Sequence, residues 1–289
     1  MNKLLLTAAL ALALVPNAHG QAAASSGPLG DLKVSGDFDY ESQYVFRGKK
    51  ITNSAFQPAV DAAYPVANGS LKAYLWTSQP IGRAGTTAGP NQTNEIDIGT
   101  YWQHSIPGVD SLTGEVGVQM YWYPDVGGNA AGAGPGGIVN PISRTYEFHV
   151  GAIYDTTSVL NKINLSPTVY LYHDIILDSN TITGAISYSW DLSDTVTKGL
   201  SLNPTATLGY TSVGRVFGDT GTKNWSNGYT FWQLDAELDY VLNSNTTLYL
   251  AGHYAGNNDG SSHGIAGSNP NFPGSQNSLW LSLSVKWNM

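Results

Sequence analysis

The sequence predicts an all-β fold, a single antiparallel up-and-down transmembrane β-barrel of about 12 strands with short periplasmic turns and longer extracellular loops. Three observations predict it. Apolar and polar residues alternate along most of the chain, the links between these runs alternate in length, and aromatic residues recur at the ends of the runs. The barrel is expected to occupy residues 33–289.

Alternation with a period of two residues indicates strands that have one apolar and one polar face. It is clearest in residues 232–240, which read WQLDAELDY. Each run has roughly ten residues, the length that a tilted membrane-spanning strand requires. The expected strands are 33–47, 54–66, 70–79, 93–104, 112–123, 144–155, 164–173, 180–191, 201–213, 229–240, 246–254 and 277–289.

The links between these strands mostly alternate between short and long, as expected for an outer-membrane barrel, except that the links at 48–53 and 174–179 are short where long ones are expected. With an even number of strands, both termini are expected in the periplasm. Short links lie at 67–69, 107–110 and 242–245, and long ones rich in Gly, Asn, Ser and Pro lie at 82–92, 126–143, 214–228 and 255–276.

Aromatic residues are expected to form a girdle at each membrane interface, because Tyr and Trp have apolar rings and polar tips. Aromatic residues are also common in strands of every kind, which explains their abundance but not their repeated position. The predicted girdle is Phe46, Tyr64, Trp102, Trp122, Tyr154, Trp190, Tyr210, Tyr240, Tyr254 and Trp287.

The first 20 residues predict a secretory signal peptide. Lys3 precedes an almost unbroken Leu and Ala run at 4–15, and small residues follow, so cleavage is expected near residues 20–22. Residues 21–32 are then a short periplasmic segment. The location this predicts is the outer membrane of a Gram-negative bacterium.

The charges exclude nucleic acid as a partner. Charged residues make up 12% of the chain, against about 25% in soluble domains. Removing the signal removes Lys3 from the 13 Lys and Arg, which leaves 12 basic residues against 21 acidic ones. Phosphate binding needs a basic face, and this chain is acidic.

The polar faces of the strands are expected to line the lumen, and they are acid-rich. In an open, hydrated lumen this excess predicts a preference for cations. In a filled lumen the same residues form an internal network of hydrogen bonds and ion pairs. The predicted lumen-lining residues are Asp37, Asp39, Glu41, Arg47, Asp61, Lys72, Glu95, Asp97, Glu115, Glu147, Asp235, Glu237, Asp239 and Lys286.

The last strand carries Leu279, Leu281, Leu283, Val285 and Trp287 on one face. This resembles the C-terminal signal that outer-membrane proteins present to the barrel-assembly machinery, although the chain ends in Met rather than the usual Phe. The expected partners are therefore outer-membrane lipid, that machinery and small polar solutes.

The segment Tyr44-Val45-Phe46-Arg47-Gly48, followed by Gln57-Pro58-Ala59-Val60-Asp61, resembles the start of the TorF-type porins. The acidic motifs at 95–99 and 147–151 are similar to those of the same family. The resemblance implies an outer-membrane porin without implying a substrate. Arg47 is expected to pair with an inward carboxylate such as Asp61 or Asp39, and to brace the wall or fix a constriction.

The expected function is passive diffusion of small polar solutes, with no catalytic, cofactor-binding or metal-binding residues. Three alternatives stay open: a plugged structural barrel, a soluble glycan-binding β-sandwich, and a barrel lipid hydrolase. An outward Ser–His pair within hydrogen-bonding distance would favour the hydrolase, and the histidines to examine are His104, His173 and His253.

Overall fold

The chain divides into two units, Met1–Leu32 and Lys33–Met289, and the second forms the barrel. The predicted signal peptide and most of the four predicted long loops lie outside the residues that the computed structural model describes. Those described residues are 30–67, 69–81, 94–124, 144–157, 159–160, 163, 165–212, 228–258 and 277–289.

Every regular element among the described residues is a strand, and none of these residues forms a helix that is long and apolar enough to cross a membrane. The strands are β1 Lys33–Glu41, β2 Tyr44–Phe46, β3 Lys49–Thr52, β4 Ala55–Val66, β5 Gly69–Pro80, β6 Glu95–Ser105, β7 Leu112–Trp122, β8 Arg144–Tyr154, β9 Thr168–Asp174, β10 Ser179–Ser187, β11 Trp190–Asp191, β12 Leu200–Thr211, β13 Tyr229–Asn243, β14 Thr246–Asn257 and β15 Ser278–Asn288.

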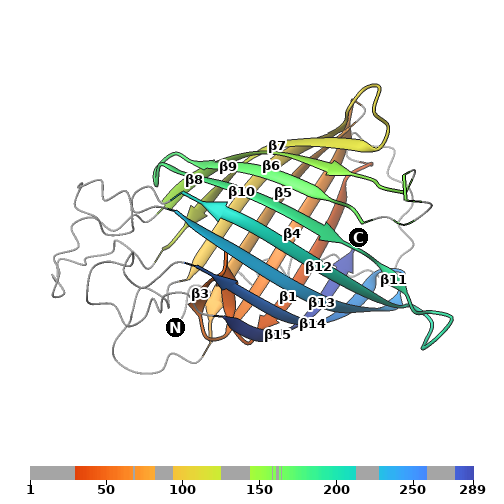
Figure 1. The fold of residues 1–289 in the computed structure, drawn as a ribbon. Coiled ribbons are helices and arrows are strands. Elements are labelled where there is room, and N and C mark those ends of the chain that lie inside the picture. The colour runs from red at the N-terminus through yellow and green to blue at the C-terminus, as the bar shows by residue number, and fades with distance from the viewer. Residues whose placement is uncertain are drawn as a thin grey trace. The chain divides into compact units, whose positions relative to one another are not determined.

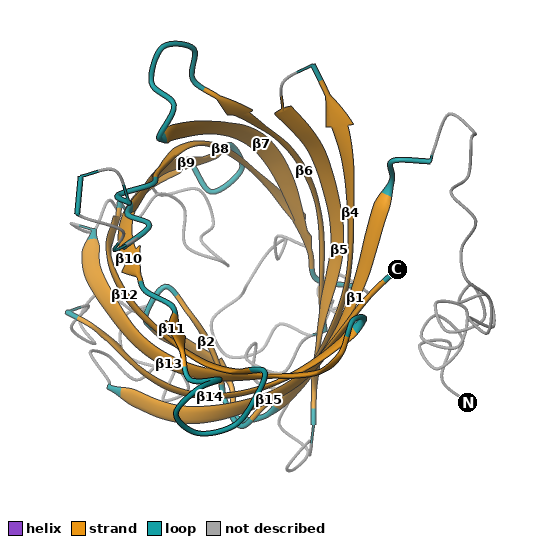
Figure 2. Cartoon of the chain, turned by 90° about the vertical axis from the view of Figure 1, so that its right-hand side faces the viewer, coloured by secondary structure: helices purple, strands orange, loops and turns teal. Residues whose placement is uncertain are grey.

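Twelve strands close into a ring, which confirms the predicted fold class (Figures 1 and 2). Neighbours along the chain pair antiparallel, β10 pairs with β12, and the ring closes where β1 pairs with β15. The thirteenth strand of the sheet, β11, pairs with β12 over two residues only. A closed ring leaves no unpaired sheet edge, so its backbone groups are satisfied without water.

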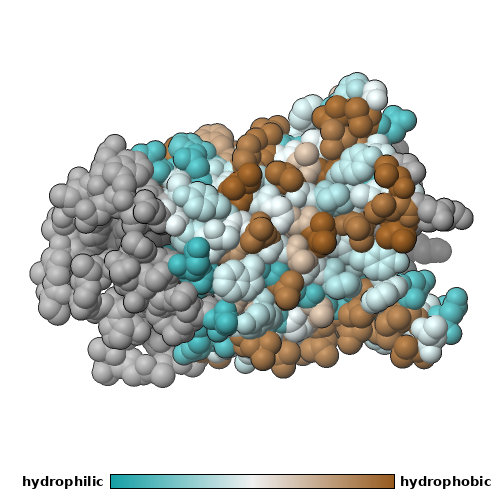
Figure 3. Space-filling view, in the orientation of Figure 1, coloured by the Kyte–Doolittle hydropathy of each residue, from teal (hydrophilic) through white to brown (hydrophobic). Residues whose placement is uncertain are grey.

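The barrel is apolar outside and polar inside, the reverse of a soluble domain. On β15 the outward Leu279, Leu281 and Leu283 are 71%, 60% and 55% exposed, whereas the inward Ser278 and Ser282 are each 7% exposed. Apolar side chains gather over the barrel wall in Figure 3. A β-sandwich would bury this apolar face, so the structure excludes that alternative.

We name the two ends of the barrel by what lies at each. The end with Lys33 and Asn288 is the terminal end, and the opposite end, toward which the β2–β3 hairpin lies, is the hairpin end. At the terminal end Asp155 Oδ1 accepts the Thr157 backbone N–H at 2.8 Å, which lowers the pKa of that carboxyl. Asp191 makes the same turn with Ser193, so short polar side chains end these strands locally.

Two predicted strands are interrupted. The run predicted at 180–191 is divided into β10 and β11. The run predicted at 33–47 ends at Glu41, and residues 44–52 form a separate two-stranded sheet, β2 and β3. This small hairpin is the main departure from the predicted meander.

Candidate functional site: the barrel lumen

The predicted lumen residues on the barrel strands alternate with the exposed apolar residues of the same strands. On β1, for example, Phe38 and Tyr40 are 42% and 45% exposed on the outer face, so Asp37, Asp39 and Glu41 face the interior. The same parity turns the other predicted strand carboxylates and Lys72 and Lys286 inward. That they border a conducting path stays a prediction.

The β2–β3 hairpin folds into the interior and contacts strands on both sides of its own base. On one side Tyr44 contacts Trp76 of β5, with ring centroids 5.5 Å apart, and Phe46 contacts Tyr121 of β7 at 6.1 Å. On the other side Lys49 Nζ lies 4.2 Å from the ring centroid of Tyr229 on β13. The hairpin therefore reaches across the lumen near the hairpin end.

The hairpin tip is a two-residue turn, Arg47-Gly48, and both residues have positive φ, 49° and 72°. This matches the twist of a tight hairpin but is costly for arginine, by about 1–2 kcal/mol. A Cβ on Gly48 would lie 2.5 Å from the Gly256 carbonyl oxygen, and the Gly48 carbonyl oxygen accepts the Asn257 side-chain amide at 2.6 Å. The hairpin tip therefore packs closely against the backbone of β14.

Arg47 pairs with Glu147 of β8, an inward carboxylate as predicted, whereas the two partners named as examples, Asp61 and Asp39, are wrong. Arg47 Nη2 lies 2.8 Å from Glu147 Oε2 and 2.9 Å from Oε1. The guanidinium also lies over the rings of Phe46 and Tyr172, 4.7 and 5.0 Å from their centroids. The sequence did not show this pair because the inward fold of the hairpin brings together residues 100 positions apart.

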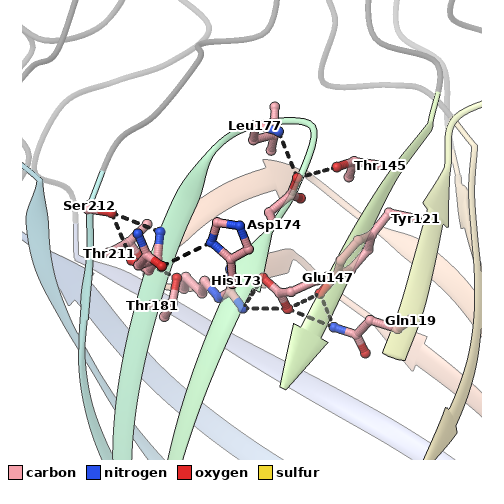
Figure 4. Close-up of polar contacts among 12 residues, drawn as sticks. Gln119, Tyr121, Thr145, Glu147, His173, Asp174, Leu177, Thr181, Thr211 and Ser212 are labelled. Carbon is pink, nitrogen blue, oxygen red and sulfur yellow. Dashed lines mark hydrogen bonds and ion pairs between the residues drawn. The ribbon is translucent and has the colours of Figure 1, made fainter. Parts of the chain in front are cut away.

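Glu147 is itself held by the wall (Figure 4). Gln119 Nε2 and the Tyr121 hydroxyl of β7 donate to Glu147 Oε1 at 2.8 and 3.0 Å, and Tyr74 donates to Gln119. The Glu147 side chain is 2% exposed and that of Arg47 14%. A buried ion pair of this kind is satisfied only while both partners and their hydrogen bonds are in place.

Other carboxylates on this side are also satisfied. Glu115 accepts a hydrogen bond from Gln103 at 2.6 Å, and its other oxygen lies 2.9 Å from His149 Nε2. Asp174 accepts from the Thr145 hydroxyl and from the backbone of the β9–β10 turn. We call β6–β9, with Glu115, Glu147 and Asp174, the paired wall. Its exceptions are Asp97 Oδ1 and His149 Nδ1, which have no hydrogen-bond partner among the described residues.

The opposite arc, β1 with β13–β15, differs. One oxygen each of Asp37, Asp39, Glu41 and Asp239 is buried without a hydrogen-bond partner in the described part of the chain. Lys286 lies opposite Asp37 in the strand register. We call this arc the open wall.

The open wall also contains a hydrogen-bonded chain of three polar side chains, and the sequence did not reveal them as a group. His253 Nδ1 lies 2.6 Å from Asp235 Oδ1, and His253 Nε2 lies 2.8 Å from Ser282 Oγ. This is the connectivity of an acid, a base and a nucleophile. It faces the lumen, whereas the alternative hydrolase was expected to use an outward pair.

The two outward histidines have other contacts. His173 Nδ1 lies 3.0 Å from Asn180 Oδ1, and the His104 ring stacks on Trp102 at 4.8 Å. Neither contact is with serine. Within the described residues, no group of three or more His, Asp or Glu side chains is placed to hold a metal ion.

The predicted girdle is wrong at Phe46, which lies in the hairpin against Tyr121 instead of facing outward. The other girdle residues have outward parity. Those near the terminal end are Tyr64, Trp102, Tyr154, Trp190, Tyr240 and Trp287, and those near the hairpin end are Trp122, Tyr210 and Tyr254. Their contact with lipid stays a prediction.

Comparisons with known proteins agree with the fold. No protein-family model and no curated protein matches the chain. Among solved structures, an outer-membrane channel of Pseudomonas putida F1 matches with a TM-score of 0.50 and 10% identity, over 93% of this chain and 99% of that one. LpxR from Salmonella typhimurium matches at 0.49 and 10%, over 88% and 99%, and a KdgM porin at 0.45 and 11%, over 89% and 99%.

Proposed function

We propose that the chain is a bacterial outer-membrane channel for passive diffusion of small polar solutes, with a preference for cations. The observation that carries the proposal is the inverted barrel, a closed ring of strands that is apolar outside and acid-rich inside. Such a ring has its backbone hydrogen bonds satisfied in lipid and surrounds a polar interior.

The arrangement of the ends supports the proposed orientation. The barrel begins at Lys33 and ends at Asn288 at one end, which we assign to the periplasm. Export by a signal peptide in residues 1–20, and recognition of β15 by the barrel-assembly machinery, belong to the same proposal. N-terminal sequencing of the mature protein tests the cleavage expected near residues 20–22.

The open wall supports the cation preference. Asp37, Asp39 and Glu41 on β1 face the same space as the acidic residues of β13, and oxygens of four of these carboxylates have no hydrogen-bond partner among the described residues. Carboxylates in a low-dielectric pore attract cations and repel anions. The paired wall contributes less, because Glu115 and Glu147 already have donors or a cation beside them.

The hairpin is the feature that separates a channel from a plugged barrel. Because its tip contacts β8 through Arg47 and β14 through Gly48, it narrows the lumen at the hairpin end. We propose a constriction rather than a complete plug. The terminal end of the open wall, around Asp37 and Asp239, lies away from the hairpin contacts.

The Asp235–His253–Ser282 chain favours a second candidate, a hydrolase whose site faces the lumen. Its hydrogen bonds suit activation of a serine. Its surroundings do not, because Glu41 lies opposite Ser282 in the strand register and Glu237 follows on the same face. Acyl transfer by serine passes through an oxyanion, which nearby carboxylates destabilise. The channel is therefore the better-supported function.

Liposome swelling tests the proposed function. Proteoliposomes would be diluted into isotonic solutions of a neutral sugar, a small organic ammonium salt and a small organic carboxylate salt of similar size. We expect swelling with the neutral and cationic solutes and slower swelling with the anionic one. Protein that inserts, as shown by heat-modifiable gel mobility, but admits none of the three solutes would contradict the proposal.

A further inference from the structure

Arg47 occupies a site that has the features of a binding site for a free guanidinium group. Its planar end contacts a carboxylate through two short N–O distances, 2.8 and 2.9 Å, and lies over the rings of Tyr172 and Phe46. Both distances are from Nη2, so the preference for a guanidinium over an ammonium group comes from its flat face, which stacks on aromatic rings as the ammonium group cannot.

Most of this site belongs to the barrel wall and not to the hairpin. Glu147 lies on β8, Tyr172 on β9, and the two donors that orient Glu147, Gln119 and Tyr121, lie on β7. Only Phe46 comes from the hairpin. The groups that orient the Glu147 carboxylate, and the Tyr172 ring beside it, therefore belong to the wall and do not depend on Arg47.

The backbone of Arg47 gives a second, independent sign that its side chain is placed for binding. Its φ of 49° belongs to the left-handed region, which disfavours a bulky side chain and favours Gly, Asn or Asp in a turn of this kind. Strain of this type persists where the surrounding contacts hold it in place. Here those contacts are the Glu147 carboxylate and the Tyr172 ring.

The hairpin tip has separate anchors, so release of Arg47 does not require the barrel to unfold. The Gly48 carbonyl oxygen accepts a hydrogen bond from the Asn257 side-chain amide of β14, and the Lys49 ammonium group lies over the Tyr229 ring of β13. Arg47 thus behaves as a tethered ligand on a short arm. A free competitor of similar affinity displaces a tethered ligand when the competitor's concentration approaches the effective concentration of the tethered group. That effective concentration is on the order of millimolar for short flexible tethers.

We propose that the Glu147–Tyr121–Tyr172 site of the wall binds the guanidinium group of small organic solutes, and that Arg47 is its resident occupant in their absence. A bound solute replaces Arg47, which frees one of the two sides on which the hairpin is held and widens the constriction. This inference rests on the proposed channel function for its physiological meaning, but the binding itself can be measured without any conductance.

The test is isothermal titration calorimetry of the folded, detergent-solubilised full chain with ethylguanidinium chloride, with ethylammonium chloride at the same ionic strength as the reference. We expect Arg47→Ala to bind ethylguanidinium at least about tenfold more tightly than the unchanged chain, because the competing arginine is gone. We expect ethylammonium to bind more weakly to the same variant.

Two matched variants assign the binding. Arg47→Ala combined with Glu147→Gln should lose most of the affinity, since it removes the carboxylate. Arg144→Ala removes an exposed arginine from the same strand, β8, and should bind like the unchanged chain. Heat-modifiable mobility confirms that each variant is folded. If Arg47→Ala does not fold, Arg47→Lys serves instead, with an affinity for ethylguanidinium above that of the unchanged chain.

Equal binding of ethylguanidinium by the unchanged chain and by the folded Arg47 variant would overturn the inference, and so would binding that survives Glu147→Gln. The proposed function fails differently. If ethylguanidinium binds tightly and this binding depends on Glu147, but no variant conducts, the guanidinium site is supported and the channel function is contradicted. Conductance without this binding would retain the channel and reject the site.

Discussion

The two walls of the lumen use similar carboxylates in different ways. On the paired wall Glu115 and Glu147 are surrounded by donors from Gln103, Gln119, Tyr121 and His149. On the open wall, buried oxygens of Asp37, Asp39, Glu41 and Asp239 have no hydrogen-bond partner among the described residues.

The difference separates carboxylates that are satisfied within the barrel from carboxylates that each keep one buried oxygen unpaired in the described part of the chain. A fully satisfied polar network rigidifies a site, whereas an unsatisfied one carries a cost that an incoming cation can relieve. The number of acidic residues in a lumen is therefore a poor guide to selectivity on its own. We propose that carboxylates with an unpaired oxygen contribute more to selectivity than those whose oxygens are both paired.

The largest effect is expected from Glu147→Gln on the paired wall. It leaves the buried Arg47 guanidinium opposite a neutral amide, and loss of one partner of a buried pair costs about 3–5 kcal/mol. Denaturant unfolding in detergent, followed by far-UV circular dichroism, measures the free energy of unfolding. Asp39→Asn on the open wall is the control, and we expect a much smaller loss or a gain of stability, because it removes a charge whose buried oxygen has no hydrogen-bond partner among the described residues. Equal losses for both variants would remove the distinction between the walls.

Gly48→Ala should act on the hairpin. A Cβ there meets the Gly256 carbonyl oxygen at 2.5 Å, and the left-handed φ adds strain, for a total of about 1–2 kcal/mol. We expect the tip to leave β14 and the single-channel conductance to rise. Gly108→Ala shares the positive φ, at 81°, but a Cβ there has nothing within 4 Å. It should leave the conductance unchanged, and an equal change in both variants would show that the hairpin does not set the constriction.

Neutralising the open wall should change selectivity more than stability. For Asp37→Asn combined with Asp239→Asn we expect the cation-to-anion permeability ratio to fall by roughly twofold, because two carboxylates are removed from the pore. Reversal potentials in a salt gradient measure this ratio. Glu115→Gln is the matched change on the paired wall, and its shift should be smaller. A larger shift from Glu115→Gln would reverse the assignment of the walls.

The smallest effect is expected at Ser282. If the nearby carboxylates prevent its activation, a fluorophosphonate probe will not label the folded protein, and Ser282→Ala will not change that result. Mass spectrometry of the treated protein reads out the adduct. Labelling that disappears in both Ser282→Ala and His253→Ala would instead establish the hydrolase.

Much of the fold was predictable because its signals are local. The alternation at 232–240 and the Asn-containing link at 242–245 place β13 and β14 to within a few residues, since strand period and turn chemistry depend on neighbouring residues. The polar faces of the strands followed from the same parity.

The hairpin was not predictable in the same way. Residues 44–47 continue the alternation of β1, so they extended the predicted strand to 47, yet the strand ends at Glu41. The available local signal was Arg47-Gly48 after the short apolar run Tyr44–Phe46, since a residue pair ending in Gly permits a two-residue turn. Nothing local indicates that the turn points inward. The Arg47–Glu147 pair depends on that direction and on strands brought together only by closure of the ring.

The most direct test of the account is the conductance of the unchanged protein in a planar lipid bilayer under a salt gradient. We expect discrete conductance steps and a reversal potential of the sign that cation preference gives. Steps with anion preference would contradict the role of the open wall. Stable insertion with no conductance, in the unchanged chain and in Gly48→Ala alike, would contradict the channel itself.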